Sequence, residues 1–435
     1  MRRSFYIRTF GCQMNISDSE IVISILTSAG YEKTASMSTA DVILFNTCSV
    51  RDKAEQSLYK QVKQIKKNST HTVVVGILGC MAQRLKDHLL ENDNVDFVLG
   101  VDEYRRIVDV IEGIFKTKER TVLAEFDNNE FYDNLKPHYG SSISAFVPII
   151  RGCNNYCTYC VVPYTRGKEK SRDFNSIITE IQNLQEQGYK EVTLLGENVN
   201  SYRYDNHNFA SLLAAIATTA PTMRIRFTSS NPQDISLQLV KTIKQHDNIC
   251  RHIHLPLQSG SNRMLRLMNR KYTREEYLEK IDMIHEELPW CSITTDIICG
   301  FCDETEEDHQ ATLDTMETVS FDSSFTFIYS ERSGTFAEKN LNDNIPLAIK
   351  RQRLEEVIEL QRELSEKKND KYIGNDVEVL VEGPSKRNKK EFFGRTTTNK
   401  VVIFHNNDNK IPPGTFLTLH ITEKTSATLF GRIIQ

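Results

Sequence analysis

The sequence predicts an α/β protein of three domains: an N-terminal parallel-sheet domain, a central partial (βα)6 barrel and a small C-terminal antiparallel β-barrel. Strand-like and helix-like segments alternate through most of the chain, which requires crossover connections and therefore parallel sheets. After Gly374 the pattern changes to short strands separated by Gly, Asn and Pro. The length of 435 residues also exceeds what one hydrophobic core normally organises.

The first domain is expected to span residues 1–127. Its strand-like runs, SFYIRTF, DVILFN and TVVVGILG, are rich in β-branched and aromatic residues. Periodic polar segments predict helices beginning near Asp18, Arg51 and Arg84, with a further helix at 104–115. The stretch 128–142 is polar, contains a proline and a glycine and lacks periodicity, so we interpret it as a linker.

The second domain is expected to span residues 143–371. Its six strand candidates are FVPII, EVTLLG, MRIRFT, HIHLPL, SITTDIIC and SFTFIY. Helix-like segments lie between them at 177–187, 209–217, 236–244, 274–287 and 306–319. Six β/α units predict an incomplete barrel or an open sheet, because the complete barrel has eight. A charged helix at 346–371 is expected to pack back across this domain, and residues 372–435 form the β-barrel.

The composition is that of an ordinary globular protein, with 39% apolar and 26% charged residues. The formal net charge of −4 gives no sign of a nucleic-acid partner through overall basicity. The chain has no run of 18 apolar residues, and its start, MRRSFYIRTFGC, lacks the apolar core of a signal peptide. We therefore expect a cytoplasmic protein that makes no membrane contact. In a reducing compartment, its ten cysteines favour metal binding or catalysis over disulfides.

Three cysteines at C-x3-C-x2-C spacing, Cys153, Cys157 and Cys160, directly follow the strand FVPII. Active sites of β/α folds lie at this carboxyl end of the strands. Thiolates bind zinc or iron–sulfur clusters, and no fourth Cys or His follows at zinc-finger spacing. The spacing favours a four-iron cluster with one open iron over a zinc loop with a distant fourth ligand.

Three further cysteines, Cys12, Cys48 and Cys80, are far apart in sequence but occupy equivalent places. Each ends a predicted parallel strand and precedes the next helix. The carboxyl ends of parallel strands meet at one edge of a sheet, so we expect a tripod of thiolates facing the second domain. Buried cysteines also serve as small apolar residues, but three matched positions favour a second ligand set.

The loop RGCNNYCTYCVVPYTRG resembles that of the radical S-adenosylmethionine superfamily. The segments TFGCQMN, NTCSVRDKAE and GCMAQR resemble the methylthiotransferase branch, whose members combine a three-cysteine domain, a radical core and a TRAM domain. The resemblance covers essentially the whole chain. The motifs are most similar to those of the branch that makes 2-methylthio-N6-isopentenyl(dimethylallyl)adenosine in tRNA. The branches acting on a ribosomal protein or on threonylcarbamoyladenosine usually differ around the first cysteine.

The resemblance implies two 4Fe-4S clusters, one S-adenosylmethionine as methyl donor and a second as radical source. The product would be an adenosine beside the anticodon, methylthiolated at C-2, with no conventional acid or base residue involved. The implied cluster ligands are Cys12, Cys48, Cys80, Cys153, Cys157 and Cys160. The resemblance and positions at strand ends together predict cofactor contacts from Tyr159, Val162, Gly196, Glu197, Ser229, Gln258, Ser259 and Asp296. Of these, Glu197 is expected to accept from the cofactor's ammonium, and the LQSGS segment of Gln258 and Ser259 fits an ordinary helix N-cap equally well.

RNA contacts are expected from PSKRNKKEFFGRT in the last domain, because basic residues bind phosphate and aromatic rings stack on bases. The resemblance to an RNA-binding TRAM domain supports this prediction. The residues concerned are Lys386, Arg387, Lys389, Lys390, Phe392, Phe393 and Arg395. The partners expected are a tRNA anticodon stem-loop and a low-potential electron donor of flavodoxin or ferredoxin type, and the chain is expected to be a monomer.

Other features leave alternatives open. Cys299 and Cys302 form C-x-x-C, which suits a redox or metal pair, but inert packing is favoured because six cysteines already complete both sites. The segment NRMLRLMNRK is either an RNA contact or an exposed basic face. Two functions rival the main hypothesis: the same chemistry on a ribosomal-protein aspartate or on threonylcarbamoyladenosine tRNA, and a non-catalytic zinc-dependent RNA-binding protein.

Overall fold

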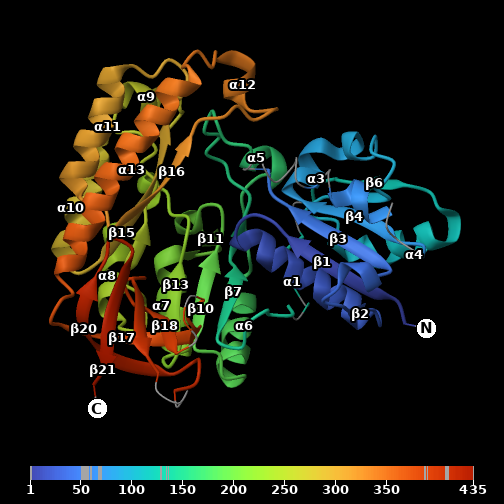
Figure 1. Ribbon diagram of the computed structural model, residues 1–435, viewed down its shortest axis with the longest axis horizontal. Helices are drawn as coiled ribbons and strands as arrows, with labels where there is room; N and C mark the ends of the chain where they lie inside the picture. The colour runs from blue at the N-terminus through green and yellow to red at the C-terminus, as the bar shows by residue number, and fades with distance from the viewer. Residues whose placement is uncertain are drawn as a thin grey trace.

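The computed structural model describes residues 2–49, 58, 61–66, 71–127, 130–133, 135, 137–386, 388, 390–406 and 411–434. Figure 1 shows an N-terminal α/β part, a central β/α part, and a small β-barrel packed at the lower end of the central part. The α/β class and the three-part architecture predicted from the sequence are confirmed.

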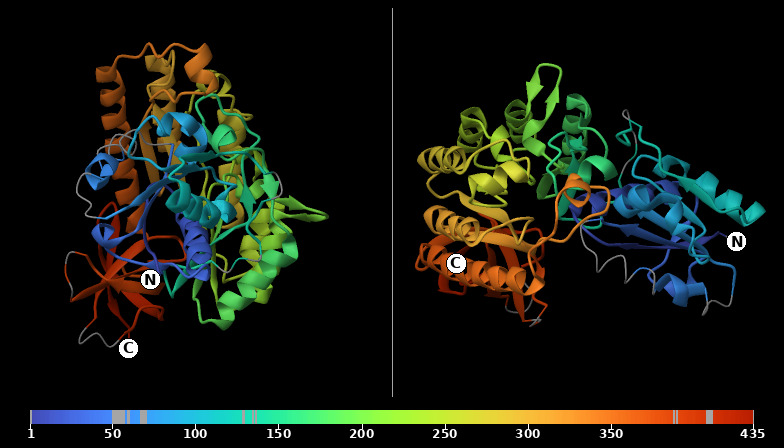
Figure 2. Two further views of the ribbon diagram at one scale, coloured as in Figure 1. Left: turned by 90° about the vertical axis from the view of Figure 1, so that its right-hand side faces the viewer. Right: turned by 90° about the horizontal axis from the view of Figure 1, so that it is seen from above.

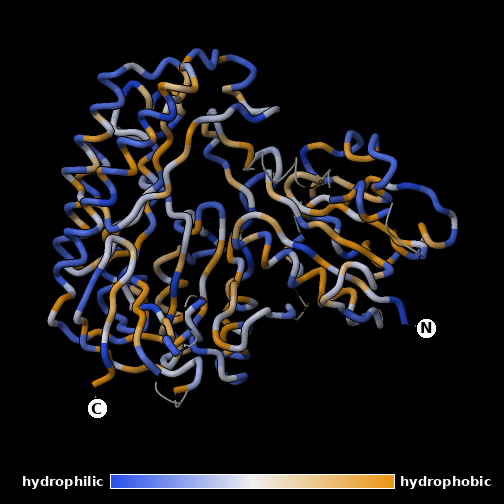
Figure 3. Tube along the Cα trace, viewed as in Figure 1, coloured by the Kyte–Doolittle hydropathy of each residue, from blue (hydrophilic) through white to orange (hydrophobic). Residues whose placement is uncertain are grey.

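The N-terminal part is built on a six-stranded parallel sheet in the order β2-β1-β3-β4-β5-β6. Every residue of β3 and β4 is buried, because alternate side chains enter hydrophobic clusters on opposite faces of the sheet. These strands are apolar runs in Figure 3. The elements are β1 (Ser4–Thr9), α1 (Gln13–Ser28), β2 (Glu32–Lys33), η1 (Met37–Thr39), β3 (Val42–Thr47), β4 (Val74–Gly79), α3 (Cys80–Leu85), η2 (Lys86–Leu89), β5 (Phe97–Leu99), η3 (Tyr104–Arg106), α4 (Ile107–Thr117) and β6 (Thr121–Leu123).

The helix predicted at 104–115 is confirmed as η3 and α4, but two other predicted helix starts in this part are too late in the sequence. The helix expected near Asp18 begins at Gln13, directly after Cys12, and the one expected near Arg84 is the short α3, which begins at Cys80 itself. The helix expected near Arg51 starts outside the described residues. Strands β2, β5 and β6 have only two or three residues, which is too short to show alternation in sequence.

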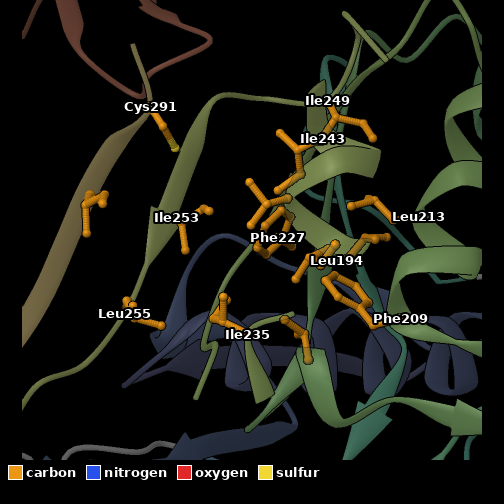
Figure 4. Close-up of a cluster of buried hydrophobic side chains, with 14 of the residues drawn as sticks. Leu194, Phe209, Leu213, Phe227, Ile235, Ile243, Ile249, Ile253, Leu255 and Cys291 are labelled. Carbon is orange, nitrogen blue, oxygen red and sulfur yellow. The ribbon is translucent and has the colours of Figure 1, made fainter. Parts of the chain in front are cut away.

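The central part contains six parallel strands in two three-stranded sheets, β13-β10-β7 and β14-β15-β16. A parallel bridge between Ile225 and Ile249 links the two sheets, so the predicted incomplete barrel is confirmed. Figure 4 shows its core, in which Phe227, Ile253 and Cys291 lie among aliphatic side chains. The strands of the barrel and its hairpins are β7 (Ser144–Pro148), β8 (Ile150–Arg151), β9 (Lys170–Ser171), β10 (Glu191–Leu195), β11 (Arg203–Tyr204), β12 (His207–Asn208), β13 (Arg224–Phe227), β14 (His252–His254), β15 (Ser292–Cys299) and β16 (Ser323–Ile328).

Helices cover the outside of this partial barrel, as Figure 2 shows from above. The helices of the central part are α5 (Val162–Thr165), α6 (Phe174–Glu186), η4 (Val199–Ser201), α7 (Phe209–Thr219), η5 (Pro232–Asp234), α8 (Leu237–Gln245), α9 (Asn262–Leu267), α10 (Arg274–Glu287), α11 (Glu306–Val319), α12 (Phe336–Asn340) and α13 (Leu347–Asp370). The long α13 buries Val357 and Leu364 in the barrel's core, as expected for a helix that packs back across the domain.

The C-terminal part is a closed barrel in the order β17-β18-β19-β21-β20. Its strands are β17 (Asp376–Pro384), β18 (Glu391–Thr396), β19 (Val401–His405), β20 (Phe416–Lys424) and β21 (Thr428–Ile433). The prediction was an antiparallel barrel, but one of its strand pairs, β19 with β21, is parallel. Among the described residues, no helix is long and apolar enough to cross a membrane.

Buried charges hold the small barrel against the central part. Arg224 on β13 donates to the carbonyl of Arg395 at 2.6 Å and pairs with Glu378 at 2.9 Å. Arg226 donates to the carbonyl of Thr396 at 2.7 Å. These charge-assisted hydrogen bonds fix the orientation of the barrel relative to the central strands.

Candidate active site

Three thiols from the N-terminal sheet line one cavity between the N-terminal and central parts. Cys12, Cys48 and Cys80 follow β1, β3 and β4, which are neighbours in the sheet. The cavity measures about 360 Å³ and is also lined by Glu197 and Asp296 of the central part. The matched strand ends therefore meet where the sequence predicts, facing the second domain. Their role as cluster ligands stays a prediction.

Glycine makes this approach of strand ends possible. Gly11 has φ of +121°, and a Cβ built on it would lie 2.5 Å from Cβ of Cys48. Gly79, with φ of +88°, would place a Cβ 2.3 Å from Oδ1 of Asn46. Positive φ and the lack of space for a Cβ both exclude other residues at these two positions, so the turns of Cys12 and Cys80 each require the glycine that precedes the cysteine.

The second trio, Cys153, Cys157 and Cys160, lines an adjoining cavity of about 230 Å³. This cavity shares Glu197 and Asp296, and also Val162 and Ser229, with the first one. The turn before the loop again needs glycine, because a Cβ on Gly152 would lie 2.2 Å from the carbonyl oxygen of Lys168. The two sets of thiols thus face one shared wall of central-domain side chains.

Nitrogen donors point at four of the six sulfurs. Nε of Arg166 lies 3.1 Å from Sγ of Cys80, and Nη1 of Arg270 lies 3.4 Å from Sγ of Cys157. Nδ2 of Asn155 donates to Cys153 at 3.4 Å, and the amide of Val162 donates to Cys160 at 3.5 Å. Such donors stabilise negative charge on sulfur and tune iron–sulfur clusters.

Sequence reasoning missed Arg166 and Arg270. Arg166 contacts a cysteine 86 residues away and Arg270 one 113 residues away, so no local pattern reveals either contact. Arg270 belongs to the basic segment NRMLRLMNRK, which the sequence left as an RNA contact or an exposed face.

Burial raises the pKa of three of these thiols, to about 12 for Cys80 and Cys160 and about 11 for Cys153. Within the described residues, no three Cys, His, Asp or Glu side chains are arranged to hold a single metal ion. The residues fit iron–sulfur clusters for two reasons: each of the two cavities is lined by three thiols, and N–H groups point at the sulfur atoms. Binding would deprotonate the thiols, because thiolate is the ligand form.

A buried ion-pair network joins the two domains beside the cavities. Asp18 on α1 pairs with Arg151 at 3.2 Å and with Arg166 at 2.6 Å. Arg166 also lies 3.7 Å from Oε1 of Glu197. The other carboxylate oxygen of Glu197, Oε2, is buried and has no hydrogen-bond partner among the described residues. Burial raises the pKa of Glu197, and the free oxygen leaves an acceptor open toward a cationic ligand.

Seven of the eight predicted cofactor contacts line these cavities or a third, mostly apolar one of about 220 Å³: Tyr159, Val162, Gly196, Glu197, Ser229, Gln258 and Asp296. Ser229 and Gln258 have φ of +63° and +71°, and backbone strain of this kind is frequent at ligand sites. Ser259, the eighth, lines none of these three cavities. Its side chain is fully buried and bonded to Thr312 at 3.2 Å, because it belongs to the helix N-cap region.

The two cysteines left open by the sequence and two histidines of β14 also have defined places in the structure. Cys299 and Cys302 are buried in hydrophobic clusters, which fits inert packing. His252 is buried against Thr294, and desolvation lowers its pKa to about 3. His254 lines the second cavity 3.4 Å from Asp296.

The predicted RNA-binding residues of the small barrel divide into four groups. Phe392 is 6% exposed and packs in the barrel core near Phe404, a position that does not favour stacking on a base. Arg395 is neutralised by Glu382 at 2.9 Å. The side chains of Lys386 and Lys390 are exposed and that of Phe393 is half-buried, whereas Arg387 and Lys389 lie outside the described residues.

Comparison with known proteins defines the class. Residues 147–316 match the radical SAM superfamily, residues 370–434 the TRAM domain and residues 4–100 the family described as UPF0004. A radical S-adenosylmethionine methyltransferase, TsrM, from Kitasatospora setae superposes with a TM-score of 0.57 at 11% identity, covering 74% of this chain and 72% of that one. The cobalamin-dependent radical enzyme OxsB gives 0.55 at 11% identity, covering 78% and 55%. At this identity, the likeness establishes the fold alone: that of a radical SAM protein.

Full-length relatives narrow the class. A tRNA-2-methylthio-N(6)-dimethylallyladenosine synthase of Phocaeicola vulgatus is 48% identical over 438 residues, covering 99% of this chain and 95% of that protein. Proteins of the same name from Bacteroides fragilis and Porphyromonas gingivalis are 48% and 46% identical, covering 99% and 100% of this chain and 95% of each relative. The chain belongs to this family of radical SAM tRNA methylthiotransferases.

Proposed function

We propose that this enzyme inserts a methylthio group at C-2 of an isopentenyl-modified adenosine next to the anticodon of tRNA. One S-adenosylmethionine would donate the methyl group and another would be the radical source. The observation that carries the proposal is the pair of three-thiol sets lining adjoining cavities between two domains. The names of the full-length relatives support the choice of substrate.

The residues fit iron–sulfur clusters and S-adenosylmethionine as cofactors, and we propose one 4Fe-4S cluster on each thiol set. When bound, the cofactors supply carbon-radical chemistry, which acts on a C–H bond that acid–base groups cannot activate. The chain's own part is to bind and place. Arg166 and Arg270 hold N–H groups against sulfur, and Oε2 of Glu197 is placed to accept from the ammonium of S-adenosylmethionine.

The cavity between the domains would also exclude water around a reactive intermediate. The wall shared by both cavities, which includes Val162 and Ser229, would hold the base between the thiol sets. An adenine ring reaches such a position only when it is unstacked from its neighbours in the RNA. Placement of this kind, rather than proton transfer by the protein, is the proposed source of specificity.

Lys386, Lys390 and Phe393 support binding of an anticodon stem-loop by the small barrel. Arg387 and Lys389 belong to the same proposed interface and lie outside the described residues. A low-potential donor of flavodoxin or ferredoxin type would supply electrons, and we propose a monomer located in the cytoplasm with its tRNA substrate. We also propose that residues 1–127, 143–371 and 372–435 act as three domains, with residues 128–142 as the linker between the first two.

Mass spectrometry of nucleosides from a deletion strain tests the function. The proposal predicts loss of the 2-methylthio form and accumulation of the isopentenyl form, with recovery when the gene is restored. If a threonylcarbamoyl-derived nucleoside or a ribosomal-protein modification were lost while the predicted nucleoside stayed intact, the enzyme would act on that rival substrate instead. A colourless anaerobic preparation that contains zinc and no iron would support the non-catalytic alternative.

A further inference from the structure

We propose that an acidic, low-potential electron-transfer protein docks on the outer surface of the loop that carries Cys153, Cys157 and Cys160. This cluster-loop face is defined by Tyr156, Tyr164, Arg266, Lys271, Phe336 and Lys339. The inference rests on the proposed function, because each radical cleavage of S-adenosylmethionine consumes one electron. In the docked complex the donor loses that electron and the cluster gains it, with no atom transferred.

Two exposed tyrosines form the centre of the cluster-loop face. Tyr156 lies within the loop, next to Cys157, and Tyr164 lies on α5 just after it. Both side chains are 44% exposed, and their rings meet edge to face with centroids 6.4 Å apart. Neither residue lines any of the three cavities described above. The rings therefore lie outside these three cavities and face solvent.

The segment after α9 places positive charge beside these rings. Nδ2 of Asn269 donates to the carbonyl of Tyr156 at 2.9 Å, and Nζ of Lys271 donates to Oδ1 of Asn269. Lys271 and Arg266 are exposed, whereas Arg263 is paired with Asp308. Arg270 of the same segment contacts the sulfur of Cys157 in the second cavity, whereas Lys271 is exposed. This basic segment therefore packs against the cysteine loop and reaches both the cavity and the surface.

Helix α12 borders the loop on another side. The amide of Ala337 donates to the carbonyl of Thr158 at 2.8 Å, so the start of α12 is fixed to the cysteine loop. Phe336 is 50% exposed and Lys339 is exposed; Glu338, between them, accepts from the amide of Gly334. Helices α9 and α12 lie at the same end of the molecule in Figure 1. Exposed aromatic rings bordered by cations fit a small acidic partner that binds transiently and is steered by charge.

RNA fits this face less well. The target base must enter the cavity between the two domains, whose lining includes none of the six residues of the cluster-loop face. An electron donor, in contrast, needs the shortest route through protein to the cluster, and Tyr156 is the covalent neighbour of a cluster cysteine. The arrangement favours the redox partner.

The test measures reduction of the cluster rather than product. In holoenzyme, the double variant Arg266→Glu with Lys271→Glu should slow cluster reduction by flavodoxin hydroquinone about tenfold at low salt, with the difference shrinking at high salt. Reduction by dithionite, iron content and affinity for an anticodon stem-loop should be unchanged. Arg351→Glu with Lys367→Glu, two exposed cations on α13, is the matched control and should behave as wild type.

Equal rates of flavodoxin-driven reduction in wild type and double variant would overturn the proposal. Loss of stem-loop affinity with normal reduction would also overturn it and assign the face to RNA. The readout is the spectrum of the cluster, so the docking test gives an answer whether or not product forms. An enzyme that made no methylthio product with any reductant would refute the proposed function and leave the docking result readable.

Discussion

Arg166 of the central domain donates from Nε to the sulfur of Cys80 in the N-terminal domain, at 3.1 Å, while its Nη1 pairs with Asp18 at 2.6 Å. One buried guanidinium thus holds a thiol of one domain and a carboxylate of α1 against the radical core. The contact ties the N-terminal thiol set to the central domain that carries the second set.

Replacing Arg166 should weaken the domain junction. Arg166→Gln leaves Asp18 buried with Arg151 as its remaining partner, and breaking a buried pair from one side costs about 3 kcal/mol. Urea unfolding of the apoprotein should show that loss, and the double variant with Asp18→Asn should lose less than the sum of the two single changes. Arg362→Gln, which breaks an exposed pair with Glu359, should change stability by less than about 0.5 kcal/mol. Additive losses would mean that the pair does not act as a unit.

Gly11→Ala should remove the N-terminal cluster selectively. The added Cβ would lie 2.5 Å from Cβ of Cys48 at a φ that disfavours alanine, so the turn carrying Cys12 must move. Iron and sulfide analysis should show about half the wild-type content, with the loop cluster's spectrum retained. Gly30→Ala is the matched control, because Gly30 also has positive φ but no atom within 4 Å of the new Cβ. Full iron content in Gly11→Ala would contradict the steric argument.

Glu20 should make stability depend on pH. It is buried on α1, accepts from the amide of Gly140 at 2.8 Å, and desolvation raises its pKa from 4.5 to about 7. The folded state therefore binds more protons than the unfolded chain between those pH values, so Glu20 lowers stability as pH rises from about 5 to 7.

Glu20→Gln should flatten this part of the profile, adding about 3 kcal/mol at most to stability at pH 8 relative to pH 5. Unfolding of the apoprotein at several pH values gives the comparison. Glu355→Gln, an exposed change on α13, should leave the slope as in wild type. A parallel shift of the Glu20→Gln curve at every pH would show that Glu20 does not titrate in this range.

Phe392 and Phe393 should respond differently to truncation. Phe392→Ala empties a core position and should cost the barrel about 3 to 5 kcal/mol. Phe393→Ala should leave the barrel folded and weaken stem-loop binding by about 1 to 3 kcal/mol through lost stacking. Circular dichroism and fluorescence titration separate the two effects. Unchanged RNA affinity in Phe393→Ala would remove this residue from the interface.

The sequence predicts well which strands carry the cysteines, because strands such as β3 and β4 are continuous apolar runs followed directly by a cysteine. The six strands of the core, and helices such as α10 and α11, follow from periodicity, and the structure adds capping boxes at Thr273 and Thr305. The loop trio follows from its C-x3-C-x2-C spacing, and the N-terminal trio follows from the matched places of its cysteines after parallel strands.

Side-chain direction and long-range pairing could not be predicted in the same way. Phe392 and Phe393 are adjacent and identical, and only the register of β18 decides which one is buried. Ser259 occupies a strand end but turns toward Thr312 on α11. The contacts of Arg166 and Arg270 depend on how distant segments pack, which no local pattern encodes.

Iron and sulfide analysis with Mössbauer spectroscopy, on wild type and on two triple variants, tests the central claim most directly. With Cys12, Cys48 and Cys80 replaced by alanine, or with Cys153, Cys157 and Cys160 so replaced, each protein should retain one four-iron cluster and about half the iron. Only wild type should methylthiolate the tRNA. A wild-type protein with a single cluster, or a triple variant that keeps both its full iron content and its product, would contradict the account.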